Sequence, residues 1–385
     1  MVTLLDFVLW GSVTAVVVVT LGYPALLMLT APIVRKRNVD ELAEPTVSLI
    51  IAAHNEESVI GEKLKNSLEL SYPRGKLEVI VASDGSTDQT NNIAISYQSR
   101  GVVLLSFPRT GKTGVQNQVA KRATGEILVF SDANALYKPD AISKLVRNFS
   151  DPDVGGVCGQ LDYLVGAEGA GSSESLYWRY EKFIKRRESE LSSVVGANGS
   201  IYAVRRSDYV QLDEDMISDF VEPLALVRSG KRVIYEPQAV SIEAASTSYG
   251  TEYRRKVRIL TRSIRGLLRM RQLLNPLRFG IFAVQLIMHK LLRFLTPAFL
   301  IAGVSALTGL ALLGKYRALF LIAVTIMTIA AIVATRQTSN RPSMFVRACH
   351  LLYYYVLTNC ALVLAWRNVV RGDRMTLWAP ERSQK

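Results

Sequence analysis

Long apolar stretches without charge lie near both ends of the chain. The first runs from Phe7 to Val34 and ends at the basic triplet 35–37. It is long enough to cross a hydrocarbon core of about 30 Å as a helix. Three shorter stretches near the C-terminus are each bounded by Arg or Lys: Leu295–Leu313, Ala318–Ala334 and Cys349–Trp366. The pattern predicts an N-terminal transmembrane helix within residues 1–37 and C-terminal transmembrane helices within residues 294–369.

Between these stretches, short β-branched runs alternate with amphipathic polar segments. Five runs have the composition of buried strands: Val47–Ala52, Leu77–Ala82, Val102–Ser106, Ile127–Ser131 and Gly156–Cys158. The segments between them show helical periodicity, as in Glu57–Leu70, Gln89–Arg100 and Thr113–Ala123. Strands that alternate with helices predict an α/β domain with a mostly parallel sheet over residues 38–253.

Segment 254–293 is apolar but is interrupted by arginines, and no acidic residue occurs from Arg254 to Gly372. This composition predicts amphipathic helices in the membrane interface, with Arg265 and Arg269 at lipid headgroups. A basic tail follows at 370–385. One crossing before the domain and three after it would place this tail opposite the basic triplet, against the preference of basic segments for the cytoplasm. Either Phe279–Met288 re-enters the membrane, or the tail is an exception.

The charge is divided unevenly along the 385 residues. Residues 1–253 contain 25 of the 46 Lys and Arg and 31 of the 33 Asp and Glu, so residues 254–385 contain 21 basic and 2 acidic residues. Basic residues among apolar runs are typical of an anionic membrane surface, and no nucleic-acid partner is expected. Because the basic triplet follows the first helix, we expect a multi-pass protein of the cell (inner) membrane with a cytoplasmic α/β domain.

Cysteines and histidines are few. The three cysteines form no CxxC pair and the three histidines form no HExxH motif, which argues against a disulfide scaffold, a structural zinc site and a zinc hydrolase. A cleaved signal peptide is also disfavoured, because no basic residue precedes the first apolar stretch and that stretch is too long.

Polar residues follow three of the predicted strands, at 53–57, 83–88 and 131–134. Ligands of parallel α/β sheets bind beyond the carboxyl ends of the strands, so these segments define a candidate site. The alternative for each is a helix cap or a turn. Lys112 follows a glycine before a predicted helix and can approach a diphosphate. A P-loop is excluded, because Ser106 stands where its first glycine is required.

Four segments resemble the inverting family 2 glycosyltransferases with a GT-A fold. They read VSLIIAAHNEE from residue 47, VIVASDGSTDQT from 79, GKTGVQNQVAKRATGEILVFSDAN from 111 and ISDFVEPLALVRSGKRVIYEP from 217. The chain is most similar to the membrane-integral branch with the cellulose, chitin, hyaluronan and poly-N-acetylglucosamine synthases. The resemblance covers residues 45–295 and implies a Rossmann-like GT-A domain that is flanked by transmembrane helices and binds a nucleotide-sugar.

The resemblance implies roles for residues at the strand ends. Asp84 would contact the uridine part of the donor, Ala53 and Glu56 would frame the same pocket, and Lys112 would approach the diphosphate. Asp132 begins the metal-binding DxD motif of the family, so the resemblance implies Mg²⁺ or Mn²⁺ as cofactor.

Asn134 replaces the second Asp of that motif. An amide oxygen can ligate a hard cation but brings no charge, so the metal would be held less tightly, or the diphosphate would depend more on Lys112. Asp219 matches the general base of the family, with a cap of the helix beginning at Phe220 as the alternative.

On the acceptor side, the resemblance implies contacts from Gly196 and Asn198, in a glycine-containing loop. The QxxRW motif of the family falls at Arg255–Ile259. Arg258 keeps the arginine, which would meet the diphosphate of the donor, while Arg255 replaces Gln and Ile259 replaces Trp. Since the Trp belongs to the platform for a growing sugar chain, its absence predicts weaker retention of the product.

We therefore expect a hexosyl- or N-acetylhexosaminyltransferase that transfers a sugar with inversion from a nucleotide-sugar, foremost a UDP-sugar. The acceptor is either a growing polysaccharide of the cell envelope or a lipid that receives a single sugar. A catalytically inactive membrane partner subunit is the alternative of another class. Membrane lipids and a second subunit, as a homodimer or a partner protein, are further expected partners, because four spans are few for a polysaccharide channel.

Overall fold

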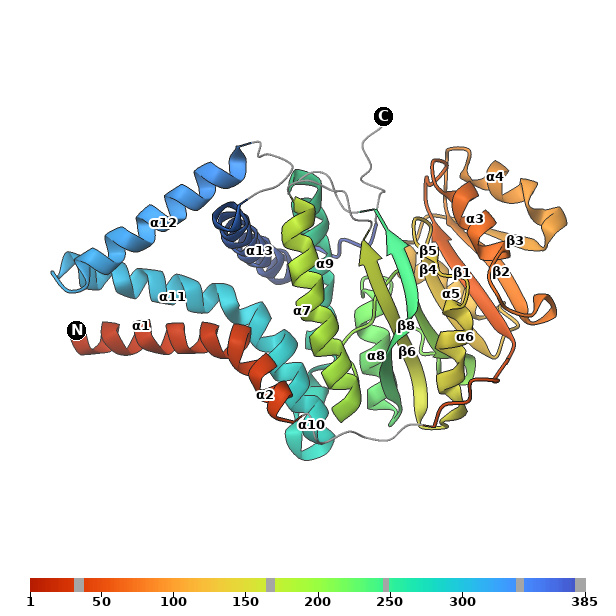
Figure 1. The fold of residues 1–385 in the computed structure, drawn as a ribbon, viewed down its shortest axis with the longest axis horizontal. Coiled ribbons are helices and arrows are strands. Elements are labelled where there is room, and N and C mark those ends of the chain that lie inside the picture. Colours follow the sequence, from red (N-terminus) through yellow and green to blue (C-terminus); the bar gives the residue numbers. More distant parts are fainter. Residues whose placement is uncertain (31–37, 164–169, 245–248, 337–342, 378–385) are drawn as a thin grey trace.

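The computed structural model describes residues 1–30, 38–163, 170–244, 249–336 and 343–377. A sheet with helices on both faces occupies one end of the molecule, and long helices extend away from it at the other end (Figure 1). Two helices, α7 (Ala170–Leu191) and α9 (Tyr249–Arg269), stand between these two parts.

An eight-stranded mixed sheet forms the centre of the domain, in the order β3-β2-β1-β4-β7-β6-β8-β5. Its strands are β1 (Val47–Ala53), β2 (Leu77–Asp84), β3 (Val102–Phe107), β4 (Ile127–Asp132), β5 (Leu136–Tyr137), β6 (Val154–Tyr163), β7 (Tyr202–Arg205) and β8 (Arg232–Glu243). Strands β1 to β4 pair in parallel with one another, as do β6 and β8, whereas β7 and β5 run antiparallel to their neighbours. The predicted mostly parallel α/β sheet is confirmed.

Helices cover both faces because alternate strand residues point in opposite directions. On one face, Leu49 and Ile51 of β1 pack into an apolar core with α3 (Ile60–Leu68), α4 (Thr90–Ser96) and α6 (Ala141–Val146). On the other face, Ile50 packs into a second core with α5 (Lys112–Ala120) and α8 (Ser218–Arg228). Short 3-10 helices connect the elements at Arg74–Lys76, Gln98–Arg100, Arg147–Ser150, Arg206–Asp208 and Arg271–Leu274.

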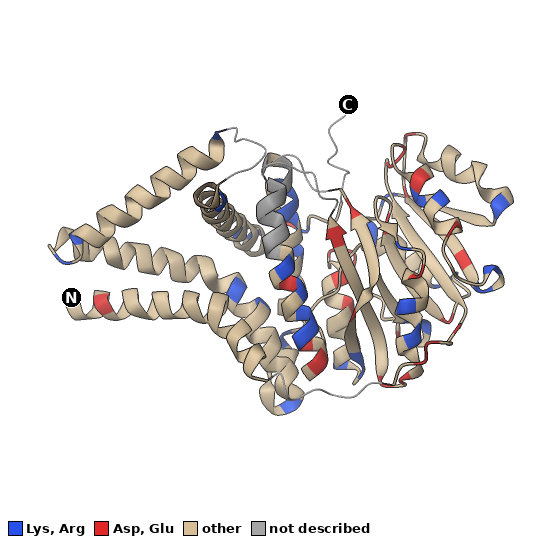
Figure 2. Ribbon diagram, viewed as in Figure 1, with Lys and Arg blue, Asp and Glu red and all other residues tan. Residues whose placement is uncertain are grey.

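Within the described residues, four helices are long and apolar enough to cross a membrane. The first, Val2–Leu29, comprises α1 (Val2–Val17), the π-helix η1 (Val18–Gly22) and α2 (Tyr23–Leu29). The second, Pro276–Leu312, comprises α10 (Pro276–Leu286), the π-helix η7 (Ile287–Leu291) and α11 (Leu292–Leu312). The others are α12 (Arg317–Thr335) and α13 (Met344–Arg371). Figure 2 shows that charged residues are concentrated in the domain and in the helices next to it, and that most of α1, α11 and α12 is uncharged.

The second candidate span begins earlier than the sequence pattern indicated. Residues 276–291 form α10 and η7, which lead into α11, and the backbone is non-helical at Gly280, with φ +53° and ψ −130°. The interface helices and the re-entry of Phe279–Met288 stay predictions. Helix α11 packs closely on α1, where a Cβ added at Gly303 would lie 3.1 Å from the Cβ of Ser12. Small residues permit this close approach of apolar helices.

Helix α13 is oriented differently from the other candidate spans. In Figure 1, α1 and α11 run lengthwise across the view, whereas α13 is seen nearly end-on. Its residues Leu362 and Ala365 share an apolar core with Phe220 of the sheet domain. The chain after α13 returns to that domain, because a Cβ added at Gly111 would lie 2.6 Å from the carbonyl oxygen of Thr376. Helix α13 therefore lies along the domain, and both its C-terminal half and the residues that follow contact it.

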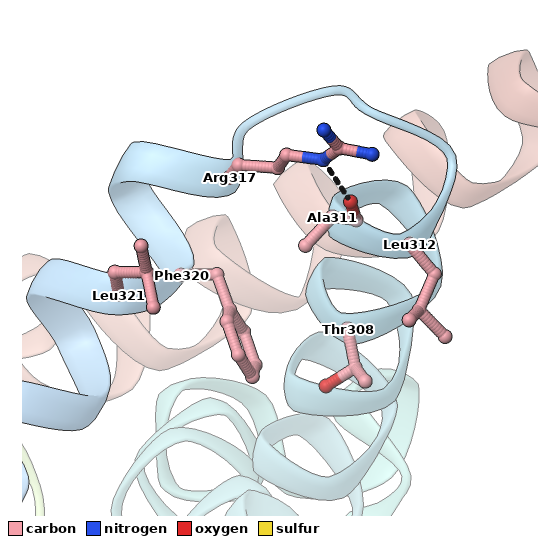
Figure 3. A pocket seen from close by; sticks show the side chains of 6 residues that line it. All are labelled: Thr308, Ala311, Leu312, Arg317, Phe320 and Leu321. Carbon is pink, nitrogen blue, oxygen red and sulfur yellow. Dashed lines mark hydrogen bonds between the residues drawn. The ribbon is translucent and has the colours of Figure 1, made fainter.

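A hollow of about 250 Å³ lies between the ends of α11 and α12 that are distant from the sheet (Figures 1 and 3). It is lined by Thr308, Ala311, Leu312, Arg317, Phe320 and Leu321. The side chain of Arg317 donates from Nε to the carbonyl oxygen of Ala311 at 3.1 Å. Its lining is mostly apolar and it is remote from the strand ends, so it is separate from the site described next.

Candidate active site

Asp84 lies at the end of β2 and is fully buried. Its carboxylate accepts backbone N–H bonds from Thr110 at 2.7 Å and from Gly111 at 3.0 and 3.1 Å. Gly111 has a φ of +90°, which favours glycine, and it directly precedes α5. Asp84 thus fixes the loop that leads into α5, and its contact with a nucleotide stays a prediction.

The loop after β1 lies beside the loop after β2. Ala53 and Glu56 are both buried, and the backbone N–H of Glu56 donates to Thr90 Oγ1 at 2.7 Å. Asn55 adopts a φ of +53°, and its side-chain oxygen accepts from the backbone N–H of Thr87 at 2.8 Å. These bonds tie together the two strand ends at which the nucleotide is expected.

Lys112 is the first residue of α5 and reaches across to the end of β4. Its ammonium group donates to the carboxylate of Asp132, and it lies 3.3 Å from the carbonyl oxygen of Gly199. Both side chains keep some solvent access, with 19% of Lys112 and 33% of Asp132 exposed. A cation and an anion therefore meet at the strand ends, a pairing that the sequence did not indicate, and their contacts with a diphosphate and a metal stay predictions.

A buried group of charged side chains supports the loop after β4. Asn134 hydrogen-bonds through its side chain to Glu243 at the end of β8, and burial together with repulsion from Asp132 raises the pKa of Glu243. The ammonium of Lys63 donates to the carbonyl oxygen of Ala135 at 2.5 Å. Burial lowers the pKa of Lys63 to about 7. Two ionisable residues, Glu243 and Lys63, therefore hold the loop after β4 in place.

Asp219 lies in the first turn of α8 and faces Lys112 across Gly199. A Cβ added at Gly199 would lie 2.7 Å from Asp219 Oδ2 and 3.1 Å from Lys112 Nζ. A side chain at this position would therefore have to displace the carboxylate of Asp219. The backbone N–H of Ala197 donates to the carbonyl oxygen of Asp219 at 2.7 Å, which joins the loop to the start of α8.

The environment of Asp219 favours a proton acceptor. Burial raises the pKa of its carboxyl group, Lys112 opposes this shift, and the neighbouring Asp132 adds to it. Lys185 and Arg262 also lower the pKa of Asp219. A carboxylate with a raised pKa is a better base than one with an ordinary pKa, which is the property that the role predicted for Asp219 requires.

The loop predicted to contact the acceptor is held by buried polar contacts. The side-chain amide of Asn198 donates to the carbonyl oxygen of Gly159 at 2.7 Å, and its oxygen accepts from the ammonium of Lys185. A Cβ added at Gly196 would lie 3.3 Å from the ring of Phe220. Asn198 is therefore a structural support of the loop, and the acceptor contacts of Gly196 and Asn198 stay predictions.

Helix α9 brings the altered QxxRW segment to the site. Arg255 opposes the rise in the pKa of Glu243, so it is close to the end of β8. Arg258 lies near Arg262, whose pKa is lowered to about 10 by burial and then by Arg258. Arg262 donates to Thr113 Oγ1 at 3.1 Å and to the carbonyl oxygens of loop 214–216, which precedes α8.

The expectation that Arg265 and Arg269 contact lipid headgroups was wrong. Arg265 pairs with Asp215 at 3.2 Å, and Arg269 pairs with Asp215 at 2.7 Å and with Asp213 at 2.6 Å. Asp215 is buried, so the two arginines satisfy a charge of the sheet domain. The pattern alone could not reveal this, because a basic helix face suits an acidic protein surface as well as a lipid surface.

The structure brings together Lys112, Asp132, Asn134 and Asp219 at one edge of the sheet, with Arg255 and Arg258 on the adjoining helix. Four charged residues of this region were not predicted: Lys63, Lys185, Glu243 and Arg262. Each lies in a strand or helix with an ordinary pattern, so no local motif marks it. In the described part of the chain, no three His, Cys, Asp or Glu residues gather as a metal cluster.

The comparisons with known proteins agree with this geometry. Residues 48–212 match the family described as Glycosyl transferase family 2. The chain is 37% identical over 162 residues to a beta-monoglucosyldiacylglycerol synthase from Nostoc sp., covering 40% of this chain and 34% of that protein. It is 28% identical over 229 residues to a poly-beta-1,6-N-acetyl-D-glucosamine synthase from Staphylococcus aureus, covering 57% of this chain and 55% of that protein. The chain thus spans about a third to about half of the length of these curated relatives.

A solved structure is similar over nearly the whole chain. A mannosyltransferase from Pyrobaculum calidifontis, in complex with GDP-Man and Mn²⁺, superposes with a TM-score of 0.75 at 22% identity, covering 96% of this chain and 99% of that one. The helices as well as the sheet domain therefore share its arrangement. Residues 48–212 form a domain of glycosyl transferase family 2, and it has the GT-A fold.

Proposed function

We propose that this protein is a membrane glycosyltransferase that transfers a sugar from a nucleotide-sugar to a hydroxyl of a membrane-proximal acceptor, with inversion. The observation that carries the proposal is the pair of groups flanking Gly199, with the carboxylate of Asp219 on one side and the ammonium of Lys112 on the other. A base and a cation at such close range suit a reaction in which one oxygen loses a proton while another gains negative charge.

Inverting transfer is a single displacement. Asp219 takes the proton of the acceptor hydroxyl, the acceptor oxygen forms a bond to the anomeric carbon, and the bond from that carbon to the diphosphate oxygen breaks. Lys112, at the N-terminus of α5, meets the negative charge that develops on the diphosphate. Arg258, on the adjoining helix, would contribute to the same task.

Asp132 and Asn134 would hold a divalent cation. Their oxygens are the ligand type that Mg²⁺ and Mn²⁺ prefer, and a cation bound there would share the carboxylate of Asp132 with the ammonium of Lys112. Mg²⁺ or Mn²⁺ would supply Lewis-acid stabilisation of the diphosphate when bound. The structural relative was solved with GDP-Man and Mn²⁺, which supports a divalent cation in the proposed reaction.

The acceptor is presented from the membrane. Helix α8, which begins beside Asp219, shares one apolar core with α9, α10 and α13, so the base adjoins the membrane helices. The two curated relatives are named for a glycolipid and a polysaccharide. Ile259, in place of the aromatic platform, favours release after one or a few sugars, and transfer of a single sugar to a lipid is therefore the preferred form of the proposal.

The test uses the full chain in phosphatidylglycerol nanodiscs that contain diacylglycerol. UDP-glucose, UDP-N-acetylglucosamine and GDP-mannose are offered in turn, nucleoside diphosphate release is measured, and the products are sized by mass spectrometry. Asp219→Asn is expected to lower turnover about 100- to 10,000-fold, because it removes the proton acceptor and keeps the shape. Donor binding by calorimetry should be unchanged, and Asp140→Asn, at an exposed carboxylate, is the matched control.

Three outcomes would contradict the proposal or its preferred form. Undiminished turnover in Asp219→Asn would remove this residue from the mechanism. No turnover of the wild type with any donor, together with normal donor binding, would favour an inactive partner subunit. Long polymer made by the wild type would identify a polysaccharide synthase instead of a lipid glycosyltransferase.

A further inference from the structure

Helix α7 carries three charged side chains on one buried face. Glu181, Lys185 and Glu188 are spaced by four and three residues, so they lie above one another on the same side of the helix. All three are buried, with at most 6% of each residue exposed. Buried charges are costly unless they are paired, so the partners of this face show what it does.

The two glutamates bind the membrane helices. Glu181 pairs with Arg293 and, at 3.2 Å, with Nε2 of His289. Glu188 pairs with Nδ1 of His289 at 2.7 Å and accepts from the hydroxyl of Tyr23 at 2.7 Å. Since Tyr23 lies in the first candidate span and His289 and Arg293 lie in the second, α7 is fixed to both of them.

Lys185 points to the catalytic domain instead. Its ammonium donates to the side-chain oxygen of Asn198, and it lies 3.8 Å from Cys158 Sγ in β6. The amide of Asn198 in turn donates to the carbonyl oxygen of Gly159. Lys185 therefore holds the loop through Asn198, against a strand of the sheet.

That loop is in direct contact with the base. Its Ala197 N–H donates to the backbone carbonyl of Asp219, and Gly199 separates the carboxylate of Asp219 from Lys112. A displacement of Asn198 would move both of its chain neighbours, Ala197 and Gly199, and therefore the bond from Ala197 to Asp219 and the contact of Gly199 with Lys112. Misplacement of a reacting group by about 1 Å can cost 100-fold in rate.

We propose that Lys185 is a positioning residue for the transfer reaction, which holds the loop 196–200, and through it Asp219, in the geometry needed to deprotonate the acceptor. The inference rests on the proposed function and extends it to a residue outside the family motifs. It makes the placement of the base depend on α7, the same helix that is bonded to the membrane spans.

The charge of Lys185 adds a measurable signature. The charged groups with the largest effect on the pKa of Asp219 are Lys112 on α5, Asp132 on β4, Lys185 on α7 and Arg262 on α9. Of these, the three cations lower the pKa of Asp219 and Asp132 raises it. Removal of Lys185 therefore raises the pKa of the base, so that its ionised form is lost at a higher pH as the pH falls.

Three substitutions separate the contribution of the Lys185 hydrogen bond from that of its charge. Lys185→Met removes the hydrogen bond and the charge, Lys185→Gln keeps a donor to Asn198 without the charge, and Lys185→Arg keeps both. Lys182→Met is the matched control, because Lys182 lies on the same helix one turn earlier and pairs with Asp162. Each full-chain protein is assayed in nanodiscs with the donor and acceptor that the wild type uses, over a range of pH.

Lys185→Met is expected to lower kcat about 100-fold, with donor affinity within about twofold of the wild type. Its acidic limb of kcat/KM should move about half a pH unit or more upward. Lys185→Gln should show the same pH shift with a smaller loss of kcat. Lys185→Arg should keep a kcat much closer to that of the wild type, and Lys182→Met should resemble the wild type. If Lys185→Met does not fold, the Gln and Arg variants carry the comparison.

The proposal is overturned if Lys185→Met, or Lys185→Gln in its place, keeps the kcat and the acidic limb of the wild type. It is also overturned if Lys182→Met loses as much activity, since α7 would then matter only for folding. These results leave the proposed function intact. Failure of the wild type with every donor, in contrast, would count against the proposed function itself.

Discussion

Glu222 is a buried carboxyl group one turn after the proposed base. Its Oε1 accepts from the backbone N–H of Val210 at 2.9 Å, and Oε2 has no hydrogen-bond partner among the described residues. Burial raises the pKa of Glu222 from 4.5 to about 8. Glu222 is therefore mainly protonated at neutral pH, and it stabilises the fold only in that form.

Glu222→Gln is expected to stabilise the protein at high pH. The folded-state pKa is above the unfolded-state value, so the contribution of Glu222 is fully present below about pH 4.5 and is lost as the pH rises through about 8. A neutral amide does not titrate. The melting temperatures of wild type and variant should agree near pH 5. Near pH 8.5 the variant should melt at a higher temperature, and its unfolding free energy should be larger by about 1 to 3 kcal/mol. Equal melting temperatures at pH 8.5 would show that Glu222 is not buried as described.

Sequence reasoning identified the residues that follow strands and missed the residues that support them. Asp84, Asp132 and Asp219 could be selected because each stands at a strand end or a helix start, where ligands of such sheets bind. Glu243 and Lys185 could not, because their roles depend on Asn134 and Asn198, which are distant in sequence. The side chains that support a site act through tertiary contacts, and no local sequence pattern marks such contacts.

Helix α9 is attached to the sheet domain by a row of arginines. Arg262, Arg265 and Arg269 recur at intervals of three and four residues, and all three bond to the loop before α8. Asp215 receives both Arg265 and Arg269 and is buried, whereas 69% of the Asp213 side chain is exposed. The energetic importance of the two acids should therefore differ.

Asp215→Asn is expected to lower the unfolding free energy by about 1 to 3 kcal/mol, since it leaves two arginines beside a neutral group in a partly buried place. Asp213→Asn, the control in the same loop, should cost less than about 1 kcal/mol, as exposed ion pairs do. Chemical denaturation of both variants in the same detergent measures the difference. Equal losses would mean that burial does not distinguish the two pairs.

The elements themselves were well predicted where one pattern prevails. The five expected strands are present because β-branched runs between turns have few alternatives. The sequence also predicted a long apolar helix at the position of α13, but it could not predict how this helix is oriented relative to the other candidate spans. An apolar helix can cross a bilayer or lie along a protein, and the sequence pattern is the same in both cases. Trp366 Nε1 donates to the carbonyl oxygen of Phe294 in α11 at 2.9 Å, a contact between two candidate spans that no sequence pattern indicates.

The placement of α13 suggests how the whole chain is arranged across the membrane. If α1, α11 and α12 cross and α13 lies along the domain, the basic tail is on the same side as the domain. The Lys315 loop is on the opposite side, where its ammonium pairs with Asp6. This arrangement agrees with the preference of basic segments for the cytoplasm, without a re-entrant segment.

Single cysteines test this arrangement, after Cys158, Cys349 and Cys360 are replaced by alanine. Arg374→Cys should react with a membrane-impermeant maleimide only in vesicles whose outer face carries the catalytic domain. The exposed Arg100→Cys in that domain is the positive control. Lys315→Cys should react only in vesicles of the opposite orientation. Reaction of Arg374→Cys together with Lys315→Cys would instead make α13 a fourth crossing.

The contact between Thr376 and Gly111 has a consequence for biosynthesis. Gly111 belongs to the loop that Asp84 fixes early in the chain, whereas Thr376 is translated after every described helix and strand. The loop that leads into Lys112 thus acquires this neighbour only once α11, α12 and α13 have left the ribosome and docked. A nascent chain halted before α13 would expose an unfinished donor site, so we expect sugar transfer to begin only after insertion into the membrane is complete.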